Sequence, residues 1–149
     1  MSLCSTSDSF YFKDVLLDAT TYRVFNYRLC SYTIFHSLPD ALNCRGTMFN
    51  INDPNNIKLV SLPPEKFFNY EEGNGAQQHE LGQLGDQMEK MDGSLISTFL
   101  HINKDNKPVV TLKSKTSVDS PQAREAMELL NGIANSRDTS RRELARIFS

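Results

Sequence analysis

The sequence predicts an α+β fold, with mainly antiparallel sheets followed by helices at the carboxyl end. Two pairs of alternating apolar segments are each joined by a short connection rich in turn-forming residues, which is the pattern of β-hairpins. After residue 119 the spacing of apolar residues changes from two to about 3.6, as in amphipathic helices. Strands first and helices last favour an α+β fold over an alternating α/β fold.

Length and composition set the broad class. A chain of 149 residues allows one domain with a moderate core, and its net charge of −2 gives no global argument for nucleic-acid binding. No apolar run is long enough to cross a bilayer, so no membrane partner is expected. The cysteines and histidines lack metal-ligand spacing, so we expect reduced thiols and histidines that lie at the surface or in packing. These residues are Cys4, Cys30, Cys44, His36, His79 and His101.

The amino-terminal residues 1–21 are interpreted as a leader. They contain a polar stretch from Ser2 to Ser9 and continue with an aromatic cluster at positions 10–12. Residues 22–29 are rich in aromatic and β-branched side chains, which predicts a strand. The sequence Leu-Pro-Asp-Ala-Leu at residues 38–42 predicts a turn with a short helix.

Two hairpins are predicted in the strand-rich part of the chain, residues 22–118. The first has strands at 47–51 and 57–62, which flank the turn sequence Asn-Asp-Pro-Asn-Asn. The second has strands at 95–101 and 109–113. In its first strand, alternate residues face opposite sides of the sheet.

The helical part covers residues 119–149 and completes a single partial domain that spans residues 1–149. Ser120 and Pro121 fit an N-cap and a first helical position. The helix that they begin has an apolar face, and a capping box at 140–143 predicts a last helix. The two apolar faces consist of Ala123, Ala126, Met127 and Leu130, and of Leu144, Ile147 and Phe148.

A glycine-rich stretch at residues 71–87 predicts a mobile surface loop, which leads to the motif Lys-Met-Asp-Gly-Ser at residues 90–94. A lysine attacks phosphorus as its neutral amine, so the site must favour that form through desolvation or nearby positive charge. Gly93 lets backbone approach a ligand, and Asp92 can orient a ribose, the lysine or a metal-bound water. The same motif also fits an ordinary turn that exposes Lys90 to solvent.

Three further clusters bear on this motif. Arg45 and Gly46 stand at the start of a strand, Lys66 precedes two phenylalanines, and the sequence Lys-Ser-Lys at residues 113–115 ends another strand. Each cluster alone also fits an ordinary role as a surface ion pair, a core aromatic or a solvated strand end. The sequence has no Gly-Lys dipeptide, hence no Walker A loop, and no dinucleotide-binding glycine motif.

Taken together and in order, these segments closely resemble the RNA ligase 1 family, the tRNA-repair ligases of T-even bacteriophages. The resemblance runs from about Tyr22 to Phe148. It rests on the segments Tyr-Arg-Val-Phe-Asn-Tyr, Leu-Pro-Asp-Ala-Leu-Asn-Cys-Arg-Gly-Thr-Met-Phe, Glu-Lys-Phe-Phe-Asn, Lys-Met-Asp-Gly-Ser-Leu-Ile-Ser-Thr and Lys-Ser-Lys.

The resemblance implies the fold and chemistry of the covalent nucleotidyltransferases. A lysine takes AMP from ATP, with Mg²⁺ balancing the triphosphate charge, and AMP then moves to the 5′-phosphate of an RNA end. A 3′-hydroxyl finally displaces AMP and seals the strand. The implied partners are RNA ends, especially those of tRNA, in the cytoplasm of an infected bacterial host.

The resemblance also implies roles for individual residues. Lys90 matches the nucleophile, and Asp92, Gly93 and Ser94 match the rest of its motif. A further group matches positions that handle the nucleotide: an arginine that can bind phosphate or ribose oxygens, an aromatic ring that offers an apolar face, and two lysines that neutralise phosphates. This group consists of Arg45, Phe68, Lys66 and Lys115. No metal-ligating residue is assigned.

The sequence lacks the family's later motifs, namely a Glu-bearing strand, a Glu-Gly motif and a Lys-x-Lys strand, together with its C-terminal domain. We therefore interpret the chain as an amino-terminal fragment that binds ATP weakly and does not complete RNA joining. An incomplete domain is expected to expose an apolar face and to self-associate.

Two alternatives stay open. One is another covalent nucleotidyltransferase, such as a DNA ligase or a capping enzyme, which substrate choice between RNA and DNA would separate from an RNA ligase. The other is a module that binds nucleotide or RNA without catalysis, in which Lys90 holds phosphate as a point charge.

Overall fold

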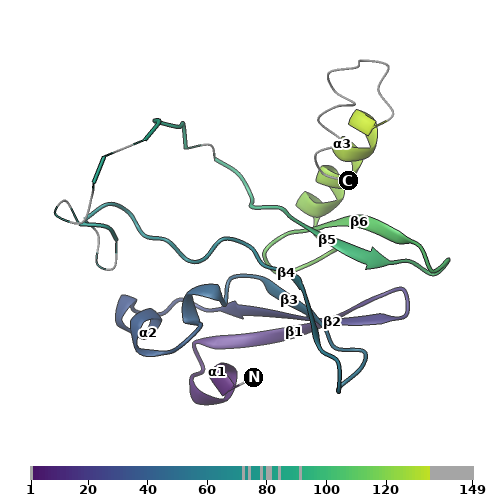
Figure 1. Ribbon diagram of the computed structural model, residues 1–149, viewed down its shortest axis with the longest axis horizontal. Helices are drawn as coiled ribbons and strands as arrows, with labels where there is room; N and C mark the ends of the chain where they lie inside the picture. Colours follow the sequence, from purple (N-terminus) through teal and green to yellow (C-terminus); the bar gives the residue numbers. More distant parts are fainter. Residues whose placement is uncertain are drawn as a thin grey trace.

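Two antiparallel sheets make up most of the structure. The computed structural model describes residues 2–71, 73, 75–77, 79, 82–83, 85–90 and 92–134. Figure 1 shows the smaller sheet lying over the larger one, with a helix following its last strand. The antiparallel sheets and the helix at the carboxyl end confirm the predicted α+β class.

The larger sheet has four antiparallel strands in the order in which they occur along the chain. They are β1 (Phe10–Leu17), β2 (Thr20–Tyr27), β3 (Thr47–Asn50) and β4 (Lys58–Ser61). β3 and β4 form the first predicted hairpin, whose register shifts between Met48 and Phe49. That hairpin is therefore confirmed, because the dense cluster of turn formers between the strands fixes the reversal.

The segment interpreted as a leader is structured. It contains the short helix α1 (Ser2–Thr6) and the edge strand β1, which pairs along its whole length with β2. Phe10 is the only buried residue of β1, and Asp14 forms a salt bridge of 2.7 Å with Arg23 on β2. An edge strand with few buried residues lacks a clear apolar alternation, which explains why the sequence pattern did not reveal β1.

A helical connection joins β2 to β3. It consists of α2 (Tyr32–Ser37) and the 3₁₀ turn η1 (Ala41–Asn43), so the predicted turn and short helix are confirmed, whereas α2 was not predicted. α2 buries Phe35, which packs with Phe10, Ala41 and Cys44 in a first core cluster. This packing fixes the end of the connection from which the chain enters β3.

The smaller sheet is the second predicted hairpin, and it is also confirmed. It consists of β5 (Ser97–Ile102) and β6 (Pro108–Lys113), so its first strand begins two residues later than expected. Phe99 and His101 are buried whereas Leu100 is 62% exposed, which confirms the expected alternation. One face of the hairpin therefore packs inward, whereas the other carries both the exposed Leu100 and the buried Leu112.

The two sheets share a second core cluster, formed by Tyr22, Val24 and Met48 from the larger sheet and Phe99 from β5. Tyr22 Oη lies 2.8 Å from His101 Nδ1, and His101 Nε2 lies 2.8 Å from an oxygen of Asp18. The hydrogen bond from His101 holds the pKa of Asp18 below its ordinary value. His101 is thus a packing residue, as expected, and its two ring nitrogens connect the sheets.

α3 (Pro121–Ala134) follows β6 and begins as predicted. The Ser120 hydroxyl accepts a hydrogen bond of 3.2 Å from the backbone amide of Ala123, which is the geometry of an N-cap. Ala123 is fully buried and Leu129, on another side of the helix, is 62% exposed. The last predicted helix, which includes residues 140–148, lies outside the described residues.

The connection between β4 and β5 carries the predicted lysine motif. Its described residues between 62 and 96 contain no strand and no α-helix, and Figure 1 shows them leaving the sheets in a long excursion. None of the helices that the structure describes is long and apolar enough to cross a membrane. The position of the motif therefore depends on a long connection and not on a strand.

Candidate active site

A pocket of about 380 Å³ lies where the chain enters β3, enters β5 and leaves β6. Its lining includes two cationic side chains and three hydroxyls, so it suits an anionic ligand with several oxygens. Ser120 caps α3 beside it, and the first turn of that helix adds the positive end of a helix dipole. The lining residues are Arg45, Ser94, Leu95, Ser114, Lys115, Thr116 and Gln122.

Each predicted cation of this region lies over an aromatic ring. The guanidinium carbon of Arg45 is 5.1 Å from the centre of Phe67, and Lys115 Nζ is 4.0 Å from the centre of Tyr27. Arg45 also donates a long hydrogen bond of 3.4 Å to a backbone oxygen, that of Glu65. A ring orients a cation without neutralising it, so both charges stay available to an anion.

Lys66 and Phe68 belong to the same neighbourhood although neither lines the pocket. Lys66 Nζ lies 5.0 Å from the centre of the Phe68 ring. Phe68 packs edge-on against Phe35 at 5.8 Å, and Phe35 packs against Tyr27 at 5.1 Å. Through these aromatic contacts the half-buried Phe68 is connected to the ring that carries Lys115.

Gly46 is held by β2 on one side and by the end of β6 on the other. Its amide donates to the Phe25 oxygen at 2.8 Å, and its own oxygen accepts from Lys113 Nζ at 2.8 Å. Its φ is +93°, and a Cβ at this position would lie 2.7 Å from the backbone oxygen of Lys115. Only glycine allows this close approach, which brings Arg45 and Lys115 to the same pocket.

Lys113 is a functional candidate that the sequence analysis missed: of the sequence Lys-Ser-Lys at residues 113–115, only Lys115 was assigned a role. It is fully buried, and burial lowers the pKa of Lys113 to about 8. The register pairs Ser97 with Lys113 and Phe99 with Thr111, so Lys113 lies on the face of the hairpin that packs inward. In the predicted hairpin, the alternation of side chains places Lys113 on the same face as the apolar Phe99. This alternation is the sequence signal that could have revealed the burial of Lys113.

The nucleophile candidate is not in the pocket in this structure. Lys90 and Asp92 are exposed, and neither lines the pocket. Gly93 has a φ of +148° and open space around its Cα, and the next residue, Ser94, does line the pocket. The motif therefore reaches the pocket through its last residue only, while Met91 lies outside the described residues.

A family model described as RNA ligase matches residues 43–148. The match covers well over half of the chain and begins two residues before Arg45. The chain belongs to this RNA ligase family. The match includes every site residue predicted from the sequence, but it assigns no role to any of them.

Among the described residues, the side chains at the pocket are not those that hold a resident metal ion. The described part of the chain holds no group of three or more histidine, cysteine, aspartate or glutamate side chains that could bind one. The pocket presents Arg45 and Lys115 to its contents, and these cations repel a free divalent ion. We therefore assign no step to a metal held by protein side chains.

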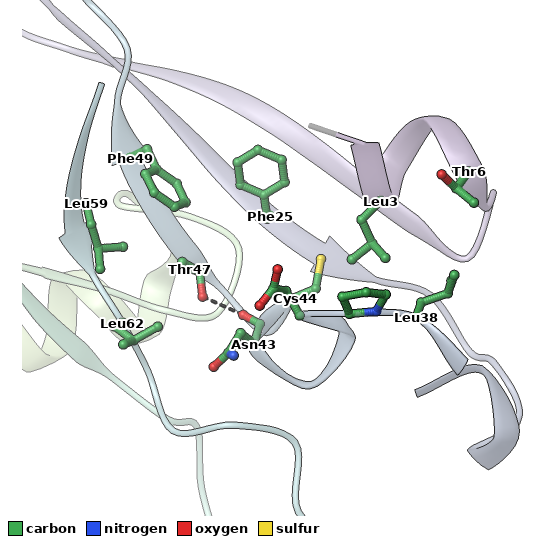
Figure 2. Close-up of a pocket in the computed structure, with 12 residues that line it drawn as sticks. Leu3, Thr6, Phe25, Leu38, Asn43, Cys44, Thr47, Phe49, Leu59 and Leu62 are labelled. Carbon is green, nitrogen blue, oxygen red and sulfur yellow. Dashed lines mark hydrogen bonds between the residues drawn. The ribbon is translucent and has the colours of Figure 1, made fainter. Parts of the chain in front are cut away.

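A second cavity of about 450 Å³ lies on the face of the larger sheet that points away from β5 and β6, called the outer face here. Figure 2 shows Leu59 near one end of this cavity and Thr6 near the other, with Phe25 and Leu3 between them. Its lining is mainly apolar and contains none of the predicted site residues. Burial raises the pKa of the Cys44 thiol in its wall to about 12, which makes this sulfur a poor nucleophile.

Proposed function

We propose that this chain carries the ATP-dependent first step of an RNA ligase, which forms a covalent lysyl-AMP intermediate. One observation carries the proposal: Arg45, Ser94 and Lys115, predicted from three separate segments, line a single pocket. The pocket thus combines a guanidinium, an ammonium and the last residue of the lysine motif, which lie far apart in the sequence. Family membership supports the ligase class, and the pocket supports binding of an anionic nucleotide.

The charges of the pocket suit a triphosphate. Arg45 can donate two parallel hydrogen bonds to phosphate oxygens, and Lys115 can act on them as a point charge. Neither is paired with a carboxylate, since the salt bridges among the described residues join Arg23 to Asp14 and His101 to Asp18. The binding energy of an anion is therefore not reduced by a competing acid.

The proposed reaction begins when the neutral amine of Lys90 attacks the α-phosphorus of ATP. A nitrogen–phosphorus bond forms, the bond from the α-phosphorus to the oxygen of the leaving pyrophosphate breaks, and the amine proton is released. The 5′-phosphate of an RNA end then takes AMP from the lysine. In the complete reaction of such ligases, attack by a 3′-hydroxyl on that activated phosphate joins the strands and releases AMP, a step that the sequence analysis does not expect of this chain.

Lys90 has to approach the pocket for this attack. Asp92 and Gly93 are the described residues between Lys90 and Ser94 of the pocket wall. Gly93 has no neighbouring atom within 4 Å of the position of a Cβ, so this short segment can change direction without a clash. We assign to Asp92 the task of orienting Lys90 or the ribose once the segment has closed.

Mg²⁺ is proposed as part of the incoming nucleotide. Hard oxygen donors such as phosphates are its preferred ligands, and it usually keeps several waters. It would reduce the negative charge on the triphosphate, whereas Arg45 and Lys115 bind the remaining oxygens. This division is consistent with a pocket of cations and hydroxyls.

RNA ends with a 5′-phosphate and a 3′-hydroxyl are the proposed substrate, with tRNA as the preferred one in an infected bacterial cell. The choice of RNA rests on family membership, and the choice of tRNA rests on the sequence resemblance. Transfer of AMP to 5′-phosphorylated DNA in preference to RNA would instead support a DNA ligase. Binding of ATP without any covalent adduct would support a module that binds without catalysis.

Intact mass after incubation with ATP and Mg²⁺ tests the covalent step. We expect an AMP adduct on the wild-type chain that is absent from Lys90→Ala, because no other amine is proposed to attack. Lys58→Ala is the matched control, since Lys58 is also exposed but lies on β4 outside the pocket. An adduct that persists in Lys90→Ala, or none on the wild type, would reject the proposal.

We further propose that the outer face promotes self-association. Leu59 and Leu62 are 51% and 60% exposed beside the apolar cavity of Figure 2. Changing both to lysine is expected to lower the average mass measured by light scattering at high protein concentration. Leu100→Lys, at a similarly exposed site on β5, should leave it unchanged. A wild type that stays monomeric over a wide concentration range would contradict this expectation.

A further inference from the structure

Lys113 is a fully buried lysine at the end of β6. Its Nζ donates to two backbone oxygens, to that of Gly46 at 2.8 Å and to that of Ser114 at 3.1 Å. It does not line the pocket, although Ser114 and Lys115 do. Its amine therefore acts on the backbone that shapes the pocket and not on the contents of the pocket.

The hydrogen bond from Lys113 to Gly46 joins the two segments that carry the pocket cations. Gly46 directly follows Arg45, and Lys113 precedes Lys115 by two residues. The Gly46 amide is bound in turn to the oxygen of Phe25 on β2. One side-chain amine thus links the entry into β3 with the exit from β6, next to both cations.

A buried ammonium group is costly, and no carboxylate in the described part of the chain forms a salt bridge with this one. Loss of solvation is the cause of the lowered pKa of Lys113, and neither of the two salt bridges among the described residues involves it. A methionine of similar length would fill the same space without this cost. What the methionine could not do is donate to the oxygens of Gly46 and Ser114.

We propose that Lys113 is a positioning residue that sets the spacing between Arg45 and Lys115 by holding the carbonyl of Gly46. That this spacing serves the binding of a nucleotide rests on the function proposed above. The link between β3 and β6 is a property of the fold, and it can be measured without any ligand.

The first test is amide hydrogen exchange of Gly46 and Lys115, measured by NMR without nucleotide. Lys113→Met is expected to speed exchange at Gly46 by about tenfold or more, because the strand entry loses one of its two anchors. Lys107→Met, on the exposed turn between β5 and β6, is the matched control and should change neither amide. Wild-type exchange rates in Lys113→Met would overturn the proposal.

The second test is ATP affinity in a double-mutant cycle of Lys113→Met with Arg45→Ala. We expect each single change to weaken binding by about tenfold and the double change to weaken it little further, because Lys113 acts through the placement of the cations. Losses that multiply would overturn the proposal. If Lys113→Met fails to fold, Lys113→Leu, which also lacks a donor, replaces it in both tests.

The two tests separate this inference from the proposed function. A wild type that does not bind ATP would reject the function, while the exchange rates of Gly46 would still test the role of Lys113. Exchange that responds to Lys113→Met, together with ATP affinity that does not, would limit Lys113 to a role in stability and reject the positioning role.

Discussion

Phe99→Ala is expected to lower the free energy of unfolding by about 3–5 kcal/mol, the usual cost of truncating a buried phenylalanine. Phe99 is 4% exposed and packs edge-on against Tyr22 at 5.5 Å, in the core that joins the two sheets. Since domains of this size are stable by about 5–15 kcal/mol, this one change removes a large part of the total. Urea denaturation followed by circular dichroism measures it.

Leu100→Ala is the matched control for that experiment. Leu100 is the next residue of β5 but faces solvent with 62% of its surface exposed. Its truncation is expected to change the free energy of unfolding by no more than about 0.5 kcal/mol, as for most surface substitutions. Equal losses in the two variants would show that β5 does not pack on the larger sheet through Phe99.

Gly46→Ala is expected to cost about 3 kcal/mol and to weaken nucleotide binding as well. The φ of +93° is strained for alanine, and its Cβ would meet the backbone oxygen of Lys115 at 2.7 Å. A backbone atom cannot rotate away as a side chain can, so the chain entering β3 has to move away from β6. This displacement would separate Arg45 from Lys115.

Gly132→Ala is the control for Gly46→Ala. Gly132 lies inside α3 with nothing within 4 Å of the position of a Cβ. Alanine favours helix over glycine by about 0.5–1 kcal/mol, so this variant is expected to be slightly more stable than the wild type. Thermal or urea denaturation of both variants gives the comparison. Similar behaviour of the two would contradict the close approach of Gly46 to Lys115.

Local sequence patterns predicted the parts of the fold that local chemistry determines. The hairpin of β3 and β4 follows from its Asn-rich connection, and the start of α3 follows from the Ser120-Pro121 pair. β1 and α2 were not predicted, because each buries few side chains and its sequence has no regular spacing of apolar residues. β1 is an edge strand held by pairing with β2, and α2 is held mainly by the burial of Phe35.

In the candidate site, too, some features follow from the local sequence and others depend on packing between distant segments. Residue identity and order predicted Arg45, Ser94 and Lys115, and the structure brings all three to one pocket. The exposed position of Lys90 depends on the path of a long connection, which no local pattern determines. The role of Lys113 depends on a contact with Gly46, 67 residues away, which only the packing of the two sheets creates.

The binding of ATP to the pocket of Arg45 and Lys115 is the central claim, and calorimetric titration tests it most directly. Arg28→Ala is a close control for Arg45→Ala, because Arg28 also lies 5.1 Å from an aromatic ring, that of Tyr11, but does not line the pocket. We expect Arg45→Ala to weaken ATP binding by about tenfold or more, as for loss of a charged hydrogen bond, and Arg28→Ala to leave it unchanged. Equal affinity in all three proteins, or no binding by the wild type, would contradict the account.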